Sequence, residues 1–128
     1  MLIKLLNMLK LKKPKFDLNL LINTLSIQTS SKDESQADEY IINRLKKLKL
    51  QYTQDFAGNI YVTKGKADLY SCIVSHKDTV HDIVEDKSVF QLGDLLFAFS
   101  EKEMKQIGIG GDDLCGVSIC LNALQDLS

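Results

Sequence analysis

Two short motifs hold the residues of this chain that are best suited to catalysis. Ser75-His76-Lys77-Asp78-Thr79-Val80 sets a histidine and an aspartate two positions apart, and Gly110-Gly111-Asp112-Asp113 sets paired aspartates after glycines. Imidazole nitrogens and carboxylate oxygens are zinc ligands, and a ligating histidine usually donates its second ring N–H to a carboxylate or a carbonyl. The His-x-Asp spacing therefore predicts a metal ligand, His76, with its own orienting carboxylate, Asp78.

The paired aspartates have two interpretations. An aspartate at the start of a helix caps free N–H groups and complements the helix dipole, which would explain Asp112 or Asp113 alone. Alternatively, one carboxylate bridges two metal ions in a hydrolytic site, in a tight turn that only glycines permit. A lone histidine is usually an ordinary surface or core residue, so it is the presence of both motifs that favours the metal site.

The segments before each motif must bring these side chains together. Residues 69–75 form an apolar run that predicts a buried strand ending at His76. Residues two apart on a strand share a face, so His76 and Asp78 are expected to point into one cleft. The glycines of residues 108–111 open a predicted helix with four apolar residues on one face: Leu114, Val117, Leu121 and Leu124.

The remaining periodicity predicts two further helices and several strands. Leu18, Leu21, Ile22 and Leu25 form a core-facing helical stripe. Ser31-Lys32-Asp33-Glu34 fits a capping box before a helix lined by Ala37, Ile41, Leu45 and Leu48. Residues 50–54 and 60–63 predict a hairpin through residues 55–59, and further strands are expected at 88–92, 95–99 and 104–107.

These elements predict an α/β fold, with a mixed β-sheet flanked by helices. The sequence stops after a helix that would normally lead into another strand, so we expect an incomplete sheet and a fragment of a larger domain. Residues 16–128 would be the N-terminal part of that catalytic domain. The uncovered sheet edge and apolar face predict self-association.

Composition bounds the partners. The 128 residues are 45% hydrophobic with a net charge of -1, which predicts one globular domain without the basic surface that nucleic acid or anionic membrane would require. Three cysteines without paired spacing favour reduced thiols in the cytoplasm. Residues 1–15 form an amphipathic segment too short to span a bilayer. We expect it to dock on the body, or else to contact a membrane surface or a partner.

The motifs together resemble those of the di-zinc exopeptidases of the aminoacylase and carboxypeptidase G2 clan, most of all its tripeptide aminopeptidase (peptidase T) branch. Residues 73–80 match an apolar strand ending in His-x-Asp-Thr-Val, and residues 111–117 match Gly-x-Asp-Asp-Lys-x-Gly-Val, with Leu114 in place of the lysine. Residues 55–65 are similar to the family's Asp-x-x-Gly-Asn hairpin, and residues 31–34 to its Ser-x-x-Glu helix start. The resemblance covers the chain from about residue 16.

The resemblance implies a role for each site residue. His76 would ligate one zinc, Asp78 would hold its ring at the active site, and Asp112 would bridge both zinc ions. Asp113 would support the turn rather than bind metal, and the peptide bond after Asp112 would be cis. His81 matches no ligand of the family and is expected to be a surface histidine.

The resemblance also implies that a full-length relative removes N-terminal residues from short peptides with two zinc ions. The family's Glu-Glu pair, which includes the general base, and its remaining ligands have no matching positions up to Ser128. The chain alone is therefore expected to bind zinc weakly and to be inactive. Two alternatives stay open: hydrolysis of another amide, such as an N-acyl amino acid, or a non-catalytic remnant or subunit that needs a second chain.

Overall fold

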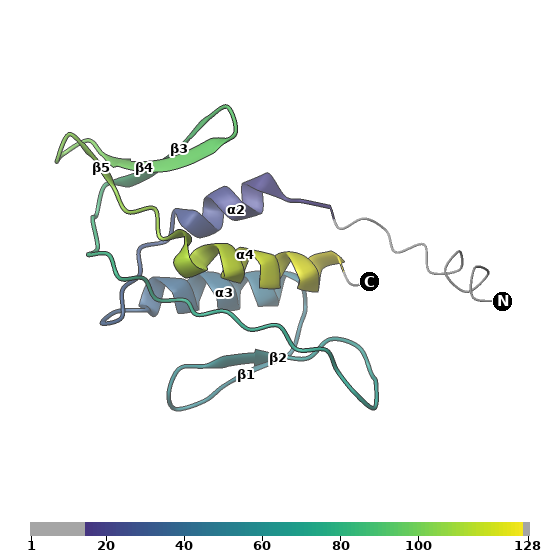
Figure 1. The fold of residues 1–128 in the computed structure, drawn as a ribbon. Helices are drawn as coiled ribbons and strands as arrows, with labels where there is room; N and C mark the ends of the chain where they lie inside the picture. The colour runs from purple at the N-terminus through teal and green to yellow at the C-terminus, as the bar shows by residue number, and fades with distance from the viewer. Residues whose placement is uncertain (1–14, 127–128) are drawn as a thin grey trace.

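A computed structural model describes residues 15–126 of the chain. Its helices lie between a two-stranded and a three-stranded sheet (Figure 1). Apart from Lys15, the predicted amphipathic segment at residues 1–15 lies outside the described residues. The elements in chain order are α2 (Leu18–Leu25), α3 (Ser35–Lys47), β1 (Tyr52–Gln54), β2 (Ile60–Val62), β3 (Lys87–Leu92), β4 (Leu95–Ser100), β5 (Lys105–Ile107) and α4 (Gly111–Asp126).

The core is built by the three helices. Six buried apolar side chains form one cluster: Leu20, Leu25, Leu45, Leu114, Val117 and Leu121. The face of α4 agrees with the prediction, because three of its four predicted residues are buried. The face of α2 is rotated from the predicted stripe: Leu20, Thr24 and Leu25 are its buried residues. Thr24 can enter the core because its hydroxyl donates to the Leu20 carbonyl at 2.7 Å, so this buried hydroxyl has a hydrogen-bond partner.

The predicted capping box before α3 is wrong. Glu34 is the N-cap residue and makes no side-chain capping bond. Asp33 Oδ1 instead accepts from the Ser35 backbone N–H at 3.0 Å and from the Ser35 hydroxyl at 2.6 Å. Because the helix begins four residues after Ser31, the Ser31 hydroxyl is free for another partner, and it donates to Asp78 Oδ2 at 2.6 Å.

The predicted hairpin and every predicted strand except residues 69–75 are present. All described strand pairs are antiparallel and form two small sheets, in place of the single mixed sheet that the sequence predicted. β1 pairs with β2 through the loop of residues 55–59, and β3, β4 and β5 form the other sheet. In the hairpin loop, Asp55 Oδ1 accepts from the backbone N–H groups of Ala57 and Asn59, while Gly58 adopts a φ of 85° that favours glycine. The α/β class, with helices flanking incomplete sheets, is confirmed.

Residues 69–75 are not the buried strand that their apolar composition predicts. This segment has no strand assignment, and Leu69, Ile73 and Val74 are 90%, 58% and 86% exposed. The reason is that neither sheet of the described chain includes this segment, so the run has no ladder partner there. Among the described residues, no helix combines the length and the apolarity that a membrane crossing requires. Cys72, Cys115 and Cys120 are all free thiols.

Candidate functional site

His76 and Asp112 lie side by side although 36 positions separate them. His76 Nε2 is 3.0 Å from Asp112 Oδ1, and His76 Nδ1 is 3.2 Å from Asp78 Oδ1. The pKa of His76 is raised: desolvation acts to lower it, but the bonds to Asp112 and Asp78 outweigh that effect. The side chains of His76 and Asp112 are 54% and 94% exposed, so a metal ion from solvent can reach both of them.

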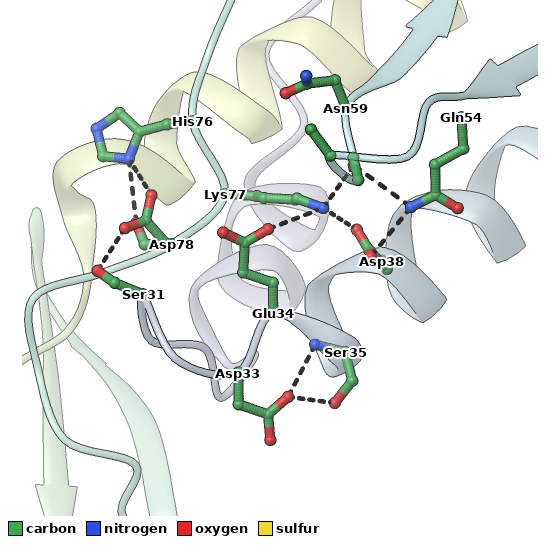
Figure 2. Close-up of polar contacts among 12 residues, drawn as sticks. Ser31, Asp33, Glu34, Ser35, Asp38, Gln54, Asn59, His76, Lys77 and Asp78 are labelled. Atoms are coloured by element: carbon green, nitrogen blue, oxygen red, sulfur yellow. Dashed lines mark hydrogen bonds and ion pairs between the residues drawn. The ribbon is translucent and has the colours of Figure 1, made fainter.

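Asp78 is held from its far side. Its Oδ2 accepts from the Ser31 hydroxyl at 2.6 Å, while Oδ1 faces the His76 ring (Figure 2). The Ser31 hydrogen bond is the main cause that lowers the pKa of Asp78, and the His76 ring adds to it. The carboxylate therefore stays ionised near neutral pH, as a group that fixes the orientation of an imidazole must.

The two neighbouring aspartates have different surroundings. Asp113 Oδ1 accepts from the Gly116 backbone N–H at 3.0 Å, and its Oδ2 accepts from the His76 backbone N–H at 3.3 Å. A Cβ on Gly116 would clash with the Asp113 carboxylate, so this capping arrangement needs a glycine there. The peptide bond between Asp112 and Asp113 is cis, as the resemblance implies. Asp113 thus ties α4 to the histidine segment, while the Asp112 carboxylate contacts the His76 ring.

The loop before α4 is held by Lys87, which belongs to no sequence motif, and by close packing at Gly110. The Lys87 ammonium donates to the carbonyl of Ile27 at 3.2 Å and to that of Ile109 at 3.0 Å. Burial lowers the pKa of Lys87 to about 8. Gly110 has a φ of 78°, and a Cβ there would meet Thr79 Cγ2 at 2.9 Å. Lys87 is a single lysine in β3 and belongs to no motif, so the sequence does not predict its bonds to the Ile27 and Ile109 carbonyls.

Lys77, between His76 and Asp78, makes contacts that the sequence motifs did not predict. Its ammonium pairs with Glu34 Oε2 at 2.9 Å and with the Asp38 carboxylate, on the side of the chain opposite to the His76 ring (Figure 2). Two signals were present in the sequence. Alternation along an extended segment places Lys77 opposite its neighbours, and Glu34 and Asp38 stand four apart at a helix start.

His81 is exposed, in agreement with the prediction for this histidine. It lines a cavity of about 290 Å³ together with Gln28, Thr79 and Lys87, among others. Neither His76 nor Asp112 lines this cavity. Within its lining, the polar groups of Gln28 and Lys87 are bonded to backbone atoms. The cavity is therefore separate from the candidate site.

The donor set suits zinc in kind but is small in number. An imidazole nitrogen and an open carboxylate are zinc ligands, and the second ring nitrogen already has its carboxylate partner. Across residues 15–126, no three His, Cys, Asp or Glu side chains gather in a way that could hold a metal ion. Residues 1–14 and 127–128 contain none of these residue types. The pair therefore fits part of a zinc site, one ligand short of the three that catalytic zinc has.

Comparison with known proteins places the fold. The structure is similar to the crystal structure of a tripeptidase from Staphylococcus aureus, with a TM-score of 0.63 and 22% sequence identity. The similarity covers 84% of this chain and 30% of the tripeptidase chain, so the sequence spans less than a third of that protein. No family model and no curated protein sequence matches the chain. At this identity the similarity establishes a peptidase-like fold.

Proposed function

We propose that this chain supplies part of the metal centre of a zinc-dependent peptidase that removes N-terminal residues from short peptides. The observation that carries the proposal is the 3.0 Å approach of His76 Nε2 to Asp112 Oδ1, with His76 Nδ1 already occupied by Asp78. Two motifs far apart in sequence meet as a ligand pair with an orienting group. The similarity of the fold to a tripeptidase supports peptides as the substrate class.

Each site residue has its own role in this proposal. His76 and Asp112 would hold the zinc, and Asp78 would keep the imidazole in the tautomer whose Nε2 lone pair is free. Asp113 holds the turn through two backbone N–H groups. When bound, zinc would lower the pKa of a water molecule and polarise the scissile carbonyl. The three free thiols agree with a cytoplasmic location, and we propose neither a nucleic-acid nor a membrane partner.

Two ligands are fewer than zinc catalysis needs, so we expect the 128 residues alone to bind zinc weakly and to release no amino acids from a tripeptide. The remaining ligands and the general base would come from residues outside this sequence. Self-association through the incomplete sheet is also part of the proposal. The other reading with support is a non-catalytic chain, since the described donor set stops at a pair.

Zinc titration calorimetry tests the ligand assignment. His76→Ala should weaken zinc binding by at least about tenfold. The midpoint of thermal unfolding of this variant should change little, because the His76 side chain is half exposed. His81→Ala is the matched control, since His81 is the other histidine of the chain and should leave the zinc affinity unchanged. Equal zinc affinity in both variants would contradict the assignment. Amino-acid release from a tripeptide by the zinc-loaded chain would contradict the expected inactivity.

A further inference from the structure

Lys77 stands between the two residues of the His-x-Asp motif and points away from both of them. Its side chain is 15% exposed, whereas that of His76 is 54% exposed. In Figure 2 the lysine reaches from the chain toward α3, while the His76 ring and the Asp78 carboxylate lie on the other side. The motif is therefore polar on both faces, one open to solvent and one turned inward.

On the inward face, the Lys77 ammonium has a partner for each of its N–H groups. Lys77 Nζ is 2.9 Å from Glu34 Oε2, donates to the Gly58 carbonyl at 2.9 Å, and also pairs with the Asp38 carboxylate. A lysine ammonium has three N–H donors, so these three acceptors use all of them. Burial acts to lower the pKa of Lys77, but Asp38 and Glu34 outweigh this effect and raise it. The lysine is charged at neutral pH.

These contacts tie the motif to two separate elements. Glu34 and Asp38 belong to the start of α3, and Gly58 belongs to the β1–β2 hairpin loop. Gln54 joins the same group, since its amide donates to Asp38 Oδ2 at 3.1 Å and to the Gly58 carbonyl at 3.3 Å. Gly58 adopts a φ of 85°, a conformation that favours glycine and that turns this loop. We name Lys77, Glu34, Asp38, Gln54 and Gly58 the lysine cage.

The segment needs such an anchor because no sheet holds it. Residues 69–75, just before His76, have no ladder partner among the described strands. The His76 backbone N–H bond to Asp113 is long at 3.3 Å. Apart from the Asp78–Ser31 bond on the open face, the next contact along the chain is the Thr79 hydroxyl donating to the Thr29 carbonyl at 2.7 Å. Between those two contacts, the cage is the attachment on the inward side.

We propose that Lys77 is a positioning residue for the metal site, and this inference rests on the proposed function only in naming the site a metal site. With the ammonium fixed in the cage, the extended backbone at residues 76–78 cannot rotate about its own axis. His76 and Asp78 are then held on the opposite face, toward Asp112 and Ser31 respectively. This role requires a side chain that is long enough to reach α3 and positively charged. Without the charge, the carboxylates of Glu34 and Asp38 would lose their cationic partner.

The test uses the whole chain and a matched set of lysine variants. Lys77→Met keeps the length of the side chain and removes its charge, Lys77→Arg keeps the charge, and Lys102→Met removes a lysine whose side chain is 70% exposed as a control. NMR of the metal-free protein reports nuclear Overhauser effects between the His76 ring and Asp78, and the backbone order of residues 76–78. Calorimetry then reports zinc affinity.

We expect Lys77→Met to lose the His76–Asp78 contacts, to become mobile at residues 76–78 and to bind zinc about tenfold more weakly, while the amide spectrum of α4 is unchanged. Lys77→Arg should restore part of each effect, and Lys102→Met should match the wild type. Retained contacts and order in Lys77→Met would overturn the proposal. Equal loosening of α4 would also overturn it, because the lysine would then stabilise the whole fold.

The NMR measurement separates the two hypotheses. If the wild-type chain binds no zinc, the proposed function fails, yet the metal-free order of residues 76–78 still decides the role of Lys77. If zinc binds through His76 but Lys77→Met leaves both the order and the affinity unchanged, the positioning role fails and the proposed function stands. Asp38→Asn offers a second variant should Lys77→Met not fold, and it should loosen residues 76–78 in the same direction.

Discussion

The two halves of the candidate site are held in place by different forces. The half that carries Asp112 and Asp113 begins α4, which packs Leu114 and Val117 at 0% and 4% exposure into the core. The half that carries His76 and Asp78 follows an exposed, unpaired segment and is fixed by charges and hydrogen bonds. Apolar packing therefore positions one ligand, and a polar cage positions the other. Substitutions should be able to disturb each half separately.

The largest effect should come from the packed half. Leu114→Ala removes a fully buried side chain from the core cluster and should lower the free energy of unfolding by about 2–5 kcal/mol. Urea unfolding followed by circular dichroism measures this loss. Ile119→Ala, on the exposed face of the same helix at 65% exposure, is the control and should stay within about 0.5 kcal/mol of the wild type. Similar losses in both variants would show that α4 does not anchor its half by packing.

This packed half is the part that the sequence predicted best. Apolar residues recurring at helical spacing identify the buried face of α4, because that spacing reflects the burial itself. The hairpin at residues 55–59 was predicted for a similar reason, since turn residues act locally. His76 and Asp78 were candidates from residue type and spacing, and the family resemblance favoured Asp112 over Asp113. The structure brings the side chains of His76, Asp78 and Asp112 together.

The polar half could not be predicted to the same extent. An apolar run such as residues 69–75 indicates a buried strand only if other strands cover it, and a local pattern does not report on neighbours. Ser31 fits a helix cap in sequence, yet its hydroxyl bonds to a carboxylate 47 positions away. Alternation places Lys77 opposite His76 and Asp78, but the sequence does not show which acceptors it reaches, because the three come from two separate elements. Long-range polar contacts leave no periodic trace.

Substitutions of the two adjacent aspartates, Asp112 and Asp113, should have an intermediate effect. One should change mainly stability and the other mainly zinc binding. Asp113→Ala removes the acceptor for the Gly116 and His76 N–H groups and should cost about 1 kcal/mol, as the loss of a helix cap does. Asp112→Ala removes a carboxylate that is 94% exposed, so stability should change by less than about 0.5 kcal/mol while zinc binding is lost. Urea unfolding and zinc calorimetry on the pair give both values. Weaker zinc binding in Asp113→Ala than in Asp112→Ala would reverse their assigned roles.

The smallest effect should come from a single hydroxyl of the polar half. Ser31 lowers the pKa of Asp78, and Ser35 does the same for Asp33. Ser31→Ala should therefore raise the pKa of Asp78 in an NMR titration and leave that of Asp33 unchanged, whereas Ser35→Ala should do the reverse. A carboxylate whose pKa is lowered by folding stabilises the protein above its unfolded-state pKa, and this contribution disappears as the pH falls through the lowered value. The small stability difference between wild type and Ser31→Ala should thus be present at neutral pH and vanish in acid. If Ser31 instead capped α3, its removal would reduce helix content and leave the pKa of Asp78 where it is.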